Sequence, residues 1–237
     1  MHRCLRARGD STTIEKAIED LRNGKPILIY DSDGREKETD IVVASQFVTG
    51  NIIRMMRKDG GGLICETLEY EKANALGLDY LVNIFKNSHM NVFNLLEPND
   101  IPYDEKSSFS ITINHRRTFT GIPDNDRALT IKEFAALLEV LATSNAAALE
   151  MLRKEFRSPG HVFLLIAAKG LLRERRGHTE LSTFIVKEAG LIPSATIVEM
   201  LDDSGTSLPK DKAMKYATDN GLVFLEGKEI IERFLRS

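Results

Sequence analysis

Five carboxylates within one short segment are the first feature of this sequence that suggests chemistry. They are Asp31, Asp33, Glu36, Glu38 and Asp40, and Arg35 and Lys37 lie between them. Carboxylates at this density repel one another unless a cation or a substrate compensates their charge. Mg²⁺ prefers carboxylate oxygens as ligands and retains several of its waters. The segment therefore indicates a metal site, and a solvated acidic loop is the alternative that the segment alone leaves open.

A second pattern, Arg175-Arg176-Gly177-His178-Thr179, precedes a segment whose apolar residues recur with helical spacing. A helix that begins here would offer free backbone N–H groups and the positive end of its dipole, which together bind phosphate. Arg175 would add a bidentate donor for the same anion. Taken alone, Thr179 fits an N-cap equally well, and His178 fits a structural histidine.

Glu199 completes the candidate set, near the C-terminal end of a strand predicted at 196–200. A carboxylate-rich turn, a cationic helix entry and this glutamate are the parts of a metal site that holds a small anionic substrate. Binding of Mg²⁺ by carboxylate and imidazole is unusual but allowed, with waters completing the octahedron. The combination of the three patterns, more than any one of them, favours this function.

The apolar runs on either side of the acidic segment must position it. Residues 26–29 and 41–44 are rich in β-branched side chains and too short for helices, so both predict strands. Further strands are expected at 63–65, 109–113, 162–165, 196–200 and 222–225. Helices are expected after an N-cap at Thr12, at 50–58, around 129–138, after Thr179, at 210–220 and at 226–236. Turns are expected at 60–62 and 157–161, and residues 77–108 form the least regular part.

Strands and helices therefore alternate irregularly, which predicts a single α/β domain at 12–237 with a mixed sheet flanked by helices. Residues 1–11 are basic, lack the apolar core of a signal peptide, and are expected to form a flexible tail. The composition, 42% apolar and 28% charged over 237 residues, is typical of a globular protein with a sizeable core.

Charge and cysteine content narrow the class of protein further. The net charge of -3 does not indicate binding to nucleic acid or to a membrane surface, which would require an excess of positive charge. No apolar run reaches the roughly 18 residues of a membrane span. Cys4 and Cys65 are too few for a four-cysteine zinc site or a disulfide framework, so a reduced cytoplasmic protein is expected.

Several motifs jointly resemble the 3,4-dihydroxy-2-butanone 4-phosphate synthase family of riboflavin biosynthesis. They are Asp33-Gly34-Arg35-Glu36-Lys37-Glu38-Thr39-Asp40, Gly60-Gly61-Gly62-Leu63-Ile64-Cys65, Arg157-Ser158-Pro159-Gly160-His161-Val162, Arg175-Arg176-Gly177-His178-Thr179-Glu180, and Glu199 with Asp202-Asp203-Ser204-Gly205. Their order and spacing fit the family from about residue 12 to 232, and residues 86–108 are similar to its archaeal branch. Thr39 and Arg176 depart from the residues common in the family, but both lie beside motif residues. The resemblance implies a three-layer α/β/α fold.

The family converts ribulose 5-phosphate to 3,4-dihydroxy-2-butanone 4-phosphate and formate with Mg²⁺, or alternatively Mn²⁺. By resemblance, Glu36 and His178 are the metal ligands, and with Asp40 and Glu199 they are the catalytic residues. The residues implied to bind the substrate are Arg35, Glu36, Asp40, Arg175, Arg176, Gly177, His178, Thr179 and Glu199. Supporting roles are implied for Glu38, Cys65, Thr120, Arg157 and His161. The family acts as a homodimer with its sites at the interface, which implies that Arg157 and His161 serve the neighbouring subunit.

Three other functions are alternatives. Some family members carry a fused GTP cyclohydrolase II domain, which needs a zinc site made of cysteines. The two cysteines of this sequence and its end at Ser237 argue against such a domain here. A metal-dependent sugar-phosphate isomerase or aldolase would use the same substrate class and release no formate. A non-enzymatic phosphosugar-binding protein would bind ribulose 5-phosphate without consuming it, although the five carboxylates would repel this anion in the absence of a metal.

Overall fold

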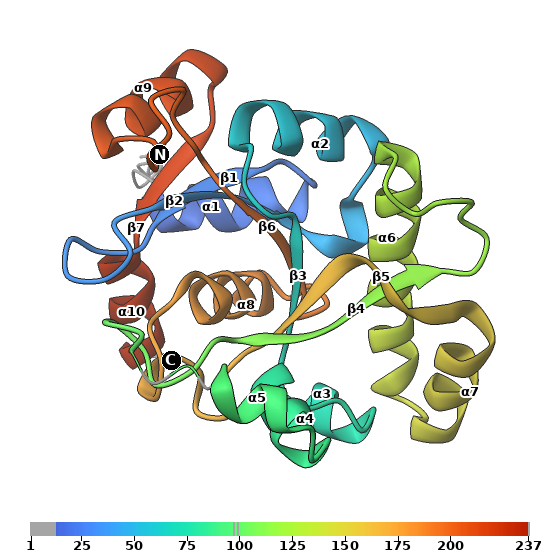
Figure 1. Cartoon of the computed structure of the whole chain (residues 1–237). Helices are drawn as coiled ribbons and strands as arrows, with labels where there is room; N and C mark the ends of the chain where they lie inside the picture. The colour runs from blue at the N-terminus through green and yellow to red at the C-terminus, as the bar shows by residue number, and fades with distance from the viewer. Residues whose placement is uncertain (1–12, 97, 99, 237) are drawn as a thin grey trace, which may run out of the picture.

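The computed structural model describes residues 13–96, 98 and 100–236, which form one α/β domain around a mixed sheet (Figure 1). Helices cover both faces of the sheet, so the predicted three-layer architecture is confirmed. The predicted tail at 1–11 and the predicted N-cap Thr12 lie outside the described residues and stay predictions. Within the described ranges, no helix has the length and apolar character that crossing a bilayer requires.

Seven strands in the described part of the chain pair in the order β4-β5-β3-β6-β2-β1-β7. Their bounds are Ile27–Tyr30 (β1), Thr39–Ala44 (β2), Cys65–Leu68 (β3), Phe109–His115 (β4), Phe156–Ile166 (β5), Ala195–Glu199 (β6) and Val223–Glu226 (β7). β1 pairs with β7, and β3 with β5, in parallel, and the other neighbouring strands are antiparallel. Because β2 lies between β1 and β6, Asp40 is placed directly beside Glu199.

The helices of the described residues form two layers. Their bounds are Thr13–Arg22 (α1), Gly50–Met55 (α2), Tyr70–Ala75 (α3), Leu81–Asn87 (α4), Asn91–Leu95 (α5), Asp124–Leu141 (α6), Asn145–Glu155 (α7), His178–Glu188 (α8), Lys210–Asn220 (α9) and Gly227–Arg236 (α10). Helices α1, α8 and α10 contribute buried side chains to one core, and α2, α6, α7 and α9 contribute to the other. Helix α8 packs against β1, β2, β3 and β6 (Figure 1), which brings its first residue to the acidic segment.

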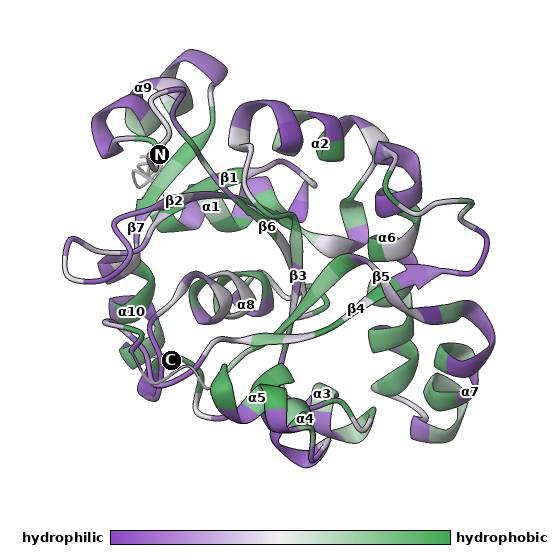
Figure 2. Ribbon diagram, in the orientation of Figure 1, coloured by the Kyte–Doolittle hydropathy of each residue, from purple (hydrophilic) through white to green (hydrophobic). Residues whose placement is uncertain are grey.

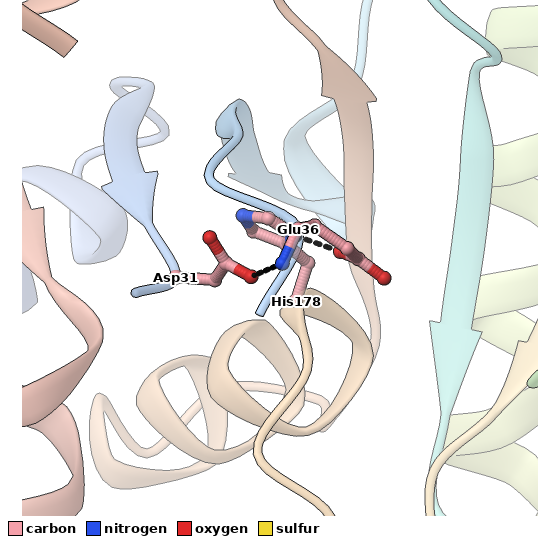
Figure 3. A group of neighbouring side chains, drawn as sticks. All are labelled: Asp31, Glu36 and His178. Atoms are coloured by element: carbon pink, nitrogen blue, oxygen red, sulfur yellow. Dashed lines mark hydrogen bonds and ion pairs between the residues drawn. The ribbon is translucent and has the colours of Figure 1, made fainter. Parts of the chain in front are cut away.

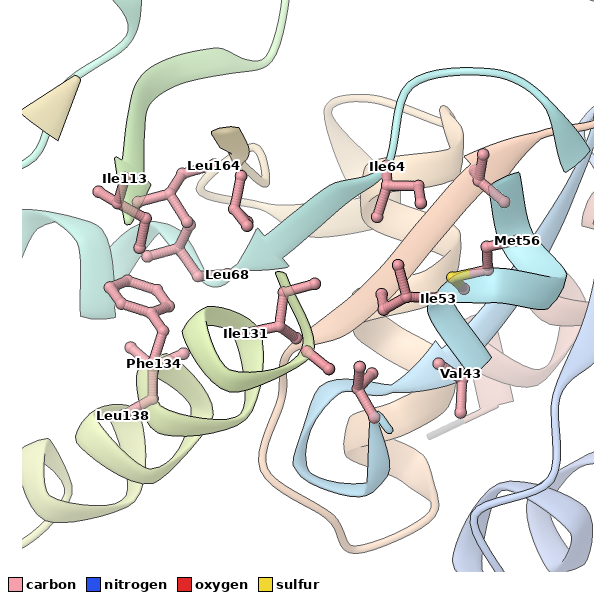
Figure 4. Close-up of a cluster of buried hydrophobic side chains, with 14 of the residues drawn as sticks. Val43, Ile53, Met56, Ile64, Leu68, Ile113, Ile131, Phe134, Leu138 and Leu164 are labelled. Atoms are coloured by element: carbon pink, nitrogen blue, oxygen red, sulfur yellow. The ribbon is translucent and has the colours of Figure 1, made fainter. Parts of the chain in front are cut away.

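The strands divide their side chains between these two cores. In β1, Ile27 and Ile29 pack on the side of α1 and α8, whereas Leu28 packs on the side of α2 and α6. This division follows from the two-residue period of a strand. Figure 4 shows the core against α2 and α6, and Figure 2 shows that β7 and part of β5 are coloured as hydrophobic while α9 is mostly hydrophilic. Burial on both faces explains why residues 26–29 and 41–44 are continuously apolar rather than alternating.

Most predicted elements are confirmed, several with shifted bounds. The strands predicted at 26–29, 41–44, 109–113, 196–200 and 222–225 and the helices at 210–220 and 226–236 match β1, β2, β4, β6, β7, α9 and α10 within two residues. The predicted helix at 50–58 ends as an α-helix at Met55 and continues as a π-helical turn to Gly60. The strand predicted at 63–65 begins only at Cys65.

The turn predicted at 157–161 is wrong, because these residues belong to β5. Pro159 and Gly160 are local turn signals, but Arg157 before them and Val162 after them both pair with β4 and keep the segment in the strand. The register with β4 shifts between Ile113 and Asn114, and a side chain at Gly160 would collide with the backbone of Ile113. Glycine therefore allows an irregular strand pair to approach closely, which is a known use of glycine within sheets.

Candidate metal and substrate site

Asp31 folds the acidic segment that connects β1 to β2. Its Oδ2 accepts a hydrogen bond from the backbone N–H of Glu36 at 2.9 Å, and its Oδ1 accepts one from the N–H of Glu38 at 3.1 Å. The carboxylate is buried. Because each of its oxygens accepts a hydrogen bond from the loop's own backbone, Asp31 positions the neighbouring carboxylates.

His178 and Glu36 meet although they are far apart in the sequence. His178 is the first residue of α8, and its Nδ1 lies 3.1 Å from Oε2 of Glu36 (Figure 3). Its Nε2 lies 3.7 Å from Oδ1 of Asp40. Asp31, Glu36 and His178 form a group whose possible ligand atoms all lie within 4.8 Å of one another. The predicted ligand pair is thus brought to one point by the loop after β1 and the start of α8.

The electrostatics of this group are those of a carboxylate cluster around one imidazole. Burial alone would lower the pKa of His178, but the charges of Asp40 and Glu36 outweigh it and raise the pKa to about 9. Burial raises the pKa of Asp40 well above its usual value, since this carboxyl is completely enclosed. For Glu36, burial raises the pKa, yet the hydrogen bond and charge of His178 prevail and hold it below its usual value.

The side-chain atoms of this cluster fit a divalent cation. Nε2 of His178 and Oδ1 of Asp40 are buried and have no hydrogen-bond partner among the described residues. Such atoms carry a desolvation cost unless an ion or a ligand compensates it. Glu36 and His178, the predicted ligand pair, lie beside these atoms and would hold the ion, and Asp31 belongs to the same group of possible ligands.

Glu199 reaches the same place from the end of β6, supported by the glycine run. Its Oε2 accepts a hydrogen bond from the N–H of Leu63 at 2.8 Å. A side chain at Gly62 would lie 2.8 Å from Cβ of Glu199, closer than two such atoms can approach. The glycines predicted to form a turn at 60–62 therefore also let this loop pack directly against Glu199. Burial raises the pKa of its carboxyl.

Two arginines form the cationic side of the site. Arg35 contacts Oε2 of Glu36 at 2.9 Å, and Arg175 donates to Oε2 of Glu180 at 2.7 Å. Glu180 is fully buried and also accepts hydrogen bonds from the N–H of Ala168 and of Gly177, so it fixes both Arg175 and the entry to α8. Gly177, not Thr179, occupies the N-cap position of α8, so the N-cap alternative for Thr179 is wrong.

Gly177 is also the point at which the two guanidinium groups converge. A side chain there would lie 2.5 Å from Nη1 of Arg175 and 2.8 Å from Nη2 of Arg35. The N–H groups of the first turn of α8 have no carbonyl partner within the helix. Arginine forks beside a helix N-terminus are a natural binding site for phosphate.

One cavity of about 450 Å³ joins the metal side to the cationic side. Of the predicted residues, it is lined by Arg35, Glu36, Glu38, Asp40, Arg175, His178, Thr179 and Glu199. Arg176 is exposed and Cys65 is buried, and neither lines the cavity. Burial raises the pKa of the Cys65 thiol, which disfavours the reactive thiolate.

Thr120, Arg157 and His161 lie elsewhere in the same chain. Asn114 joins two of them, since its amide nitrogen lies 3.1 Å from both the carbonyl of Thr120 and Nδ1 of His161. Arg157 donates to the carbonyl oxygen of Thr118 at 3.1 Å. None of the three lines the cavity, so within one subunit the structure does not bring them to Glu36 and His178.

Sequence reasoning missed Tyr103 and Asp104, which line the cavity from the segment before β4. Asp104 accepts hydrogen bonds from Nε and Nη2 of Arg175 at 3.0 and 2.7 Å and is also paired with Arg35. The only signal in the sequence was their place in a long segment without regular periodicity, where functional residues are often found.

A second group of possible metal ligands does not fit a metal. It consists of His115, Glu133 and Glu155. Nδ1 of His115 accepts a hydrogen bond from the N–H of Arg117, so the neutral ring carries its proton on Nε2, which faces Glu155 at 3.3 Å. Arg117 also pairs with Glu133 at 2.6 Å. Unlike the first group, none of the three has a buried side-chain atom without a hydrogen-bond partner among the described residues.

Comparison with known proteins decides the family. The model of the 3,4-dihydroxy-2-butanone 4-phosphate synthase family matches residues 15–233. The chain belongs to this family. The synthase of Methanothermobacter thermautotrophicus is 46% identical over 225 residues, covering 94% of this chain and 96% of that protein. The synthase of Methanosarcina mazei is 44% identical over 239 residues, covering 99% and 95%. The predicted resemblance to the archaeal branch is thereby confirmed.

Solved structures of 3,4-dihydroxy-2-butanone 4-phosphate synthases have the same fold. One that contains two magnesium ions superposes with a TM-score of 0.77 at 28% identity, covering 94% of this chain and 97% of that chain. A cation-free form gives a TM-score of 0.75 at 26% identity, covering 96% and 99%. The predicted single-domain synthase fold is therefore confirmed by structure as well as by sequence.

Proposed function

We propose that the protein converts D-ribulose 5-phosphate to 3,4-dihydroxy-2-butanone 4-phosphate and formate, a step of riboflavin biosynthesis. The observation that carries this proposal is one cavity in which the Glu36–His178 pair faces the guanidinium groups of Arg35 and Arg175. A sugar phosphate has vicinal oxygens for a cation at one end and a phosphate for arginines at the other. The two products contain all the atoms of the substrate, so the reaction needs neither an oxidant nor a second substrate.

Mg²⁺ is the cofactor that this site supports best, held by Glu36 and His178. When bound, such an ion supplies a positive charge that stabilises negative charge developing on substrate oxygens. A family member has been solved with two magnesium ions. Mn²⁺ is a second candidate, because carboxylate and water ligands suit both ions.

The protein's own side chains would transfer the protons and hold the phosphate. Asp40 is a buried carboxyl whose pKa is raised by burial, and it lines the cavity, where it is placed to exchange a proton with a substrate carbon or hydroxyl. Glu199, at the opposite register position on β6, has a raised pKa for the same reason and is a second proton carrier. Arg175, Thr179 and the first turn of α8 would hold the phosphate. We also propose a cytoplasmic location, since the buried Cys65 is a free thiol.

The proposed function is tested by incubating the purified protein with ribulose 5-phosphate and Mg²⁺ and following the products by NMR. We expect formate and the four-carbon phosphate to appear in equal amounts, and EDTA to stop the reaction. Conversion without formate would support a sugar-phosphate isomerase or aldolase instead. Saturable binding of ribulose 5-phosphate without any conversion would support a non-enzymatic binding protein.

We propose, further, that the protein is a homodimer whose sites are completed across the interface. His161 is exposed, and it lies beside a loop in which Phe119 is 94% exposed and Ile122 is 50% exposed. Apolar side chains of this size and exposure favour burial against another protein surface. A second copy of this chain would bury them and would carry Arg157 and His161 toward the neighbouring cavity.

Mixed dimers provide the test of this arrangement. His161→Ala and Glu36→Gln are each expected to be inactive as homodimers, and a mixture of the two should recover at most about a quarter of wild-type activity. Half of randomly mixed dimers are heterodimers, and each rebuilds one intact site of two, as two-fold symmetry requires. The measurement is formate release after co-expression. If subunits exchange and activity stays at the level of the parents, both residues serve the same subunit's site or His161 is structural.

A further inference from the structure

A carboxylate of the protein itself lies between the two arginines of the cavity. Oδ2 of Asp104 accepts hydrogen bonds from Nε and Nη2 of Arg175, at 3.0 and 2.7 Å, and from Nη2 of Arg35. One oxygen thus receives three N–H groups from two guanidinium groups. The side chain of Asp104 is only 12% exposed, so this pairing is largely shielded from water.

The pairing has the geometry of an anion subsite. Guanidinium groups that converge on a single acceptor oxygen bind phosphate oxygens and carboxylate oxygens in the same way. Gly177 leaves the space in which the two groups converge, and the positive end of α8 lies next to it. Asp104 therefore occupies the position at which the arginines would bind an anionic group of a substrate.

The segment that carries Asp104 is weakly attached to the rest of the protein. We call residues 101–108 the strap. Within the strap, Pro102, Tyr103, Glu105 and Lys106 are exposed and only Ser108 is buried. Two further contacts hold its middle: the ring of Tyr103 against Arg35, at 5.1 Å, and Lys106 over the ring of Tyr80, at 3.8 Å. Its C-terminal end is fixed to β5, because the carbonyl oxygen of Ser108 accepts a hydrogen bond from the N–H of Ile166 at 2.9 Å.

Cavities adjoin the strap in two places. It lines the cavity of about 450 Å³ with Glu36 and His178, and it lines a second cavity of about 600 Å³ with Ala168 and Glu174. A segment with few buried apolar contacts and space beside it opens at low free energy.

We propose that Asp104 is a tethered competitor for the anion subsite, which holds the strap over the cavity until a phosphate displaces it. In the proposed function, that anion would be the phosphate of ribulose 5-phosphate. Only this identification of the anion rests on the proposed function. Free phosphate bears the same chemistry and is the probe of choice. The strap would then be shut in the unliganded protein and released by the ligand.

The expected size of the effect follows from population arithmetic. A ligand that binds only the open form has an apparent affinity reduced by the fraction of molecules that are open. If the strap is open in about one molecule in ten, removing the competitor tightens phosphate binding by about tenfold. The same removal of charge elsewhere on the strap should have little effect, because exposed charges are screened.

The experiment compares Asp104→Asn with Glu105→Gln, the adjacent and exposed carboxylate of the strap. Binding of inorganic phosphate is measured by calorimetry in metal-free buffer. We expect about tenfold tighter binding for Asp104→Asn and wild-type binding for Glu105→Gln. Unchanged or weaker binding in Asp104→Asn overturns the proposal, and equal tightening in both variants reduces it to a general effect of charge.

Hydrogen exchange on the wild-type protein gives a second measurement that needs no variant. Saturating phosphate is expected to speed amide exchange in residues 101–108 as Asp104 leaves the arginines, while α8 becomes more protected. Slower exchange in the strap on phosphate binding overturns the proposal. Neither measurement depends on turnover, so a failure to release formate and a failure of the tethered competitor are separate results.

Discussion

Replacing Glu36 by Gln is expected to lower formate release from ribulose 5-phosphate by about a thousandfold. The substitution keeps the shape of the side chain and removes the charge that would bind Mg²⁺. Metal ions contribute several kcal/mol of charge stabilisation, and each 1.4 kcal/mol is about a factor of ten in rate. The measurement is the turnover rate at saturating Mg²⁺, together with binding of Mn²⁺ followed by electron paramagnetic resonance.

Asp33→Asn is the matched control for that result. Asp33 belongs to the same acidic segment but is exposed and accepts a hydrogen bond from the hydroxyl of Tyr30 at 2.6 Å. It should keep near-normal turnover and metal binding, and both variants should unfold at a temperature close to that of the wild type. Near-normal Mg²⁺-dependent turnover in Glu36→Gln would rule out Glu36 as an essential ligand.

Asp40→Asn is expected to reduce kcat by a factor of about 10² to 10⁴, the range typical of a lost acid–base group. The substitution preserves the shape of the side chain next to His178 and removes its ability to exchange a proton. KM for ribulose 5-phosphate should change little, because Arg175 and the first turn of α8 still hold the phosphate. Steady-state kinetics that separate kcat from KM provide the test.

Glu66→Gln is the control for that variant. Glu66 is also a fully buried carboxyl on a central strand, and burial raises its pKa, but it accepts a hydrogen bond from Ser194 and does not line the cavity. Its replacement should leave kcat unchanged. If Asp40→Asn loses activity only through a higher KM, Asp40 orients the substrate and carries no proton.

The chemistry of the site was readable from the sequence because its residues occur in short local groups. Glu36 and Asp40 lie within five residues of each other in the sequence, and His178 and Thr179 are adjacent at one helix entry, so each group is visible without knowledge of the fold. Their convergence depends on long-range pairing, in which β2 lies beside β6 and α8 packs against both. The resemblance to a family predicted that these groups form one site. Local patterns alone did not predict it.

Other features escaped local reasoning for physical reasons. Pro159 and Gly160 indicate a turn in any local scheme, and only the pairing of Arg157 and Val162, on either side of them, with β4 keeps them within a strand. Asp104 has no partner near it in the sequence, since Arg35 and Arg175 both lie about 70 residues away along the chain. In contrast, α7 had a readable signal that was not used: Ser144 caps it by accepting a hydrogen bond from the N–H of Ala147.

The order of the strands also bears on how the chain folds during synthesis. The β1–β2 hairpin emerges early from the ribosome, but its two neighbours in the sheet are β6 and β7, which are made about 150 or more residues later. Until then both edges of an apolar hairpin are unpaired, and contacts of this sequence separation form slowly. We therefore expect a nascent chain to depend on chaperones until β6 has been made, with Glu36 and His178 meeting only then.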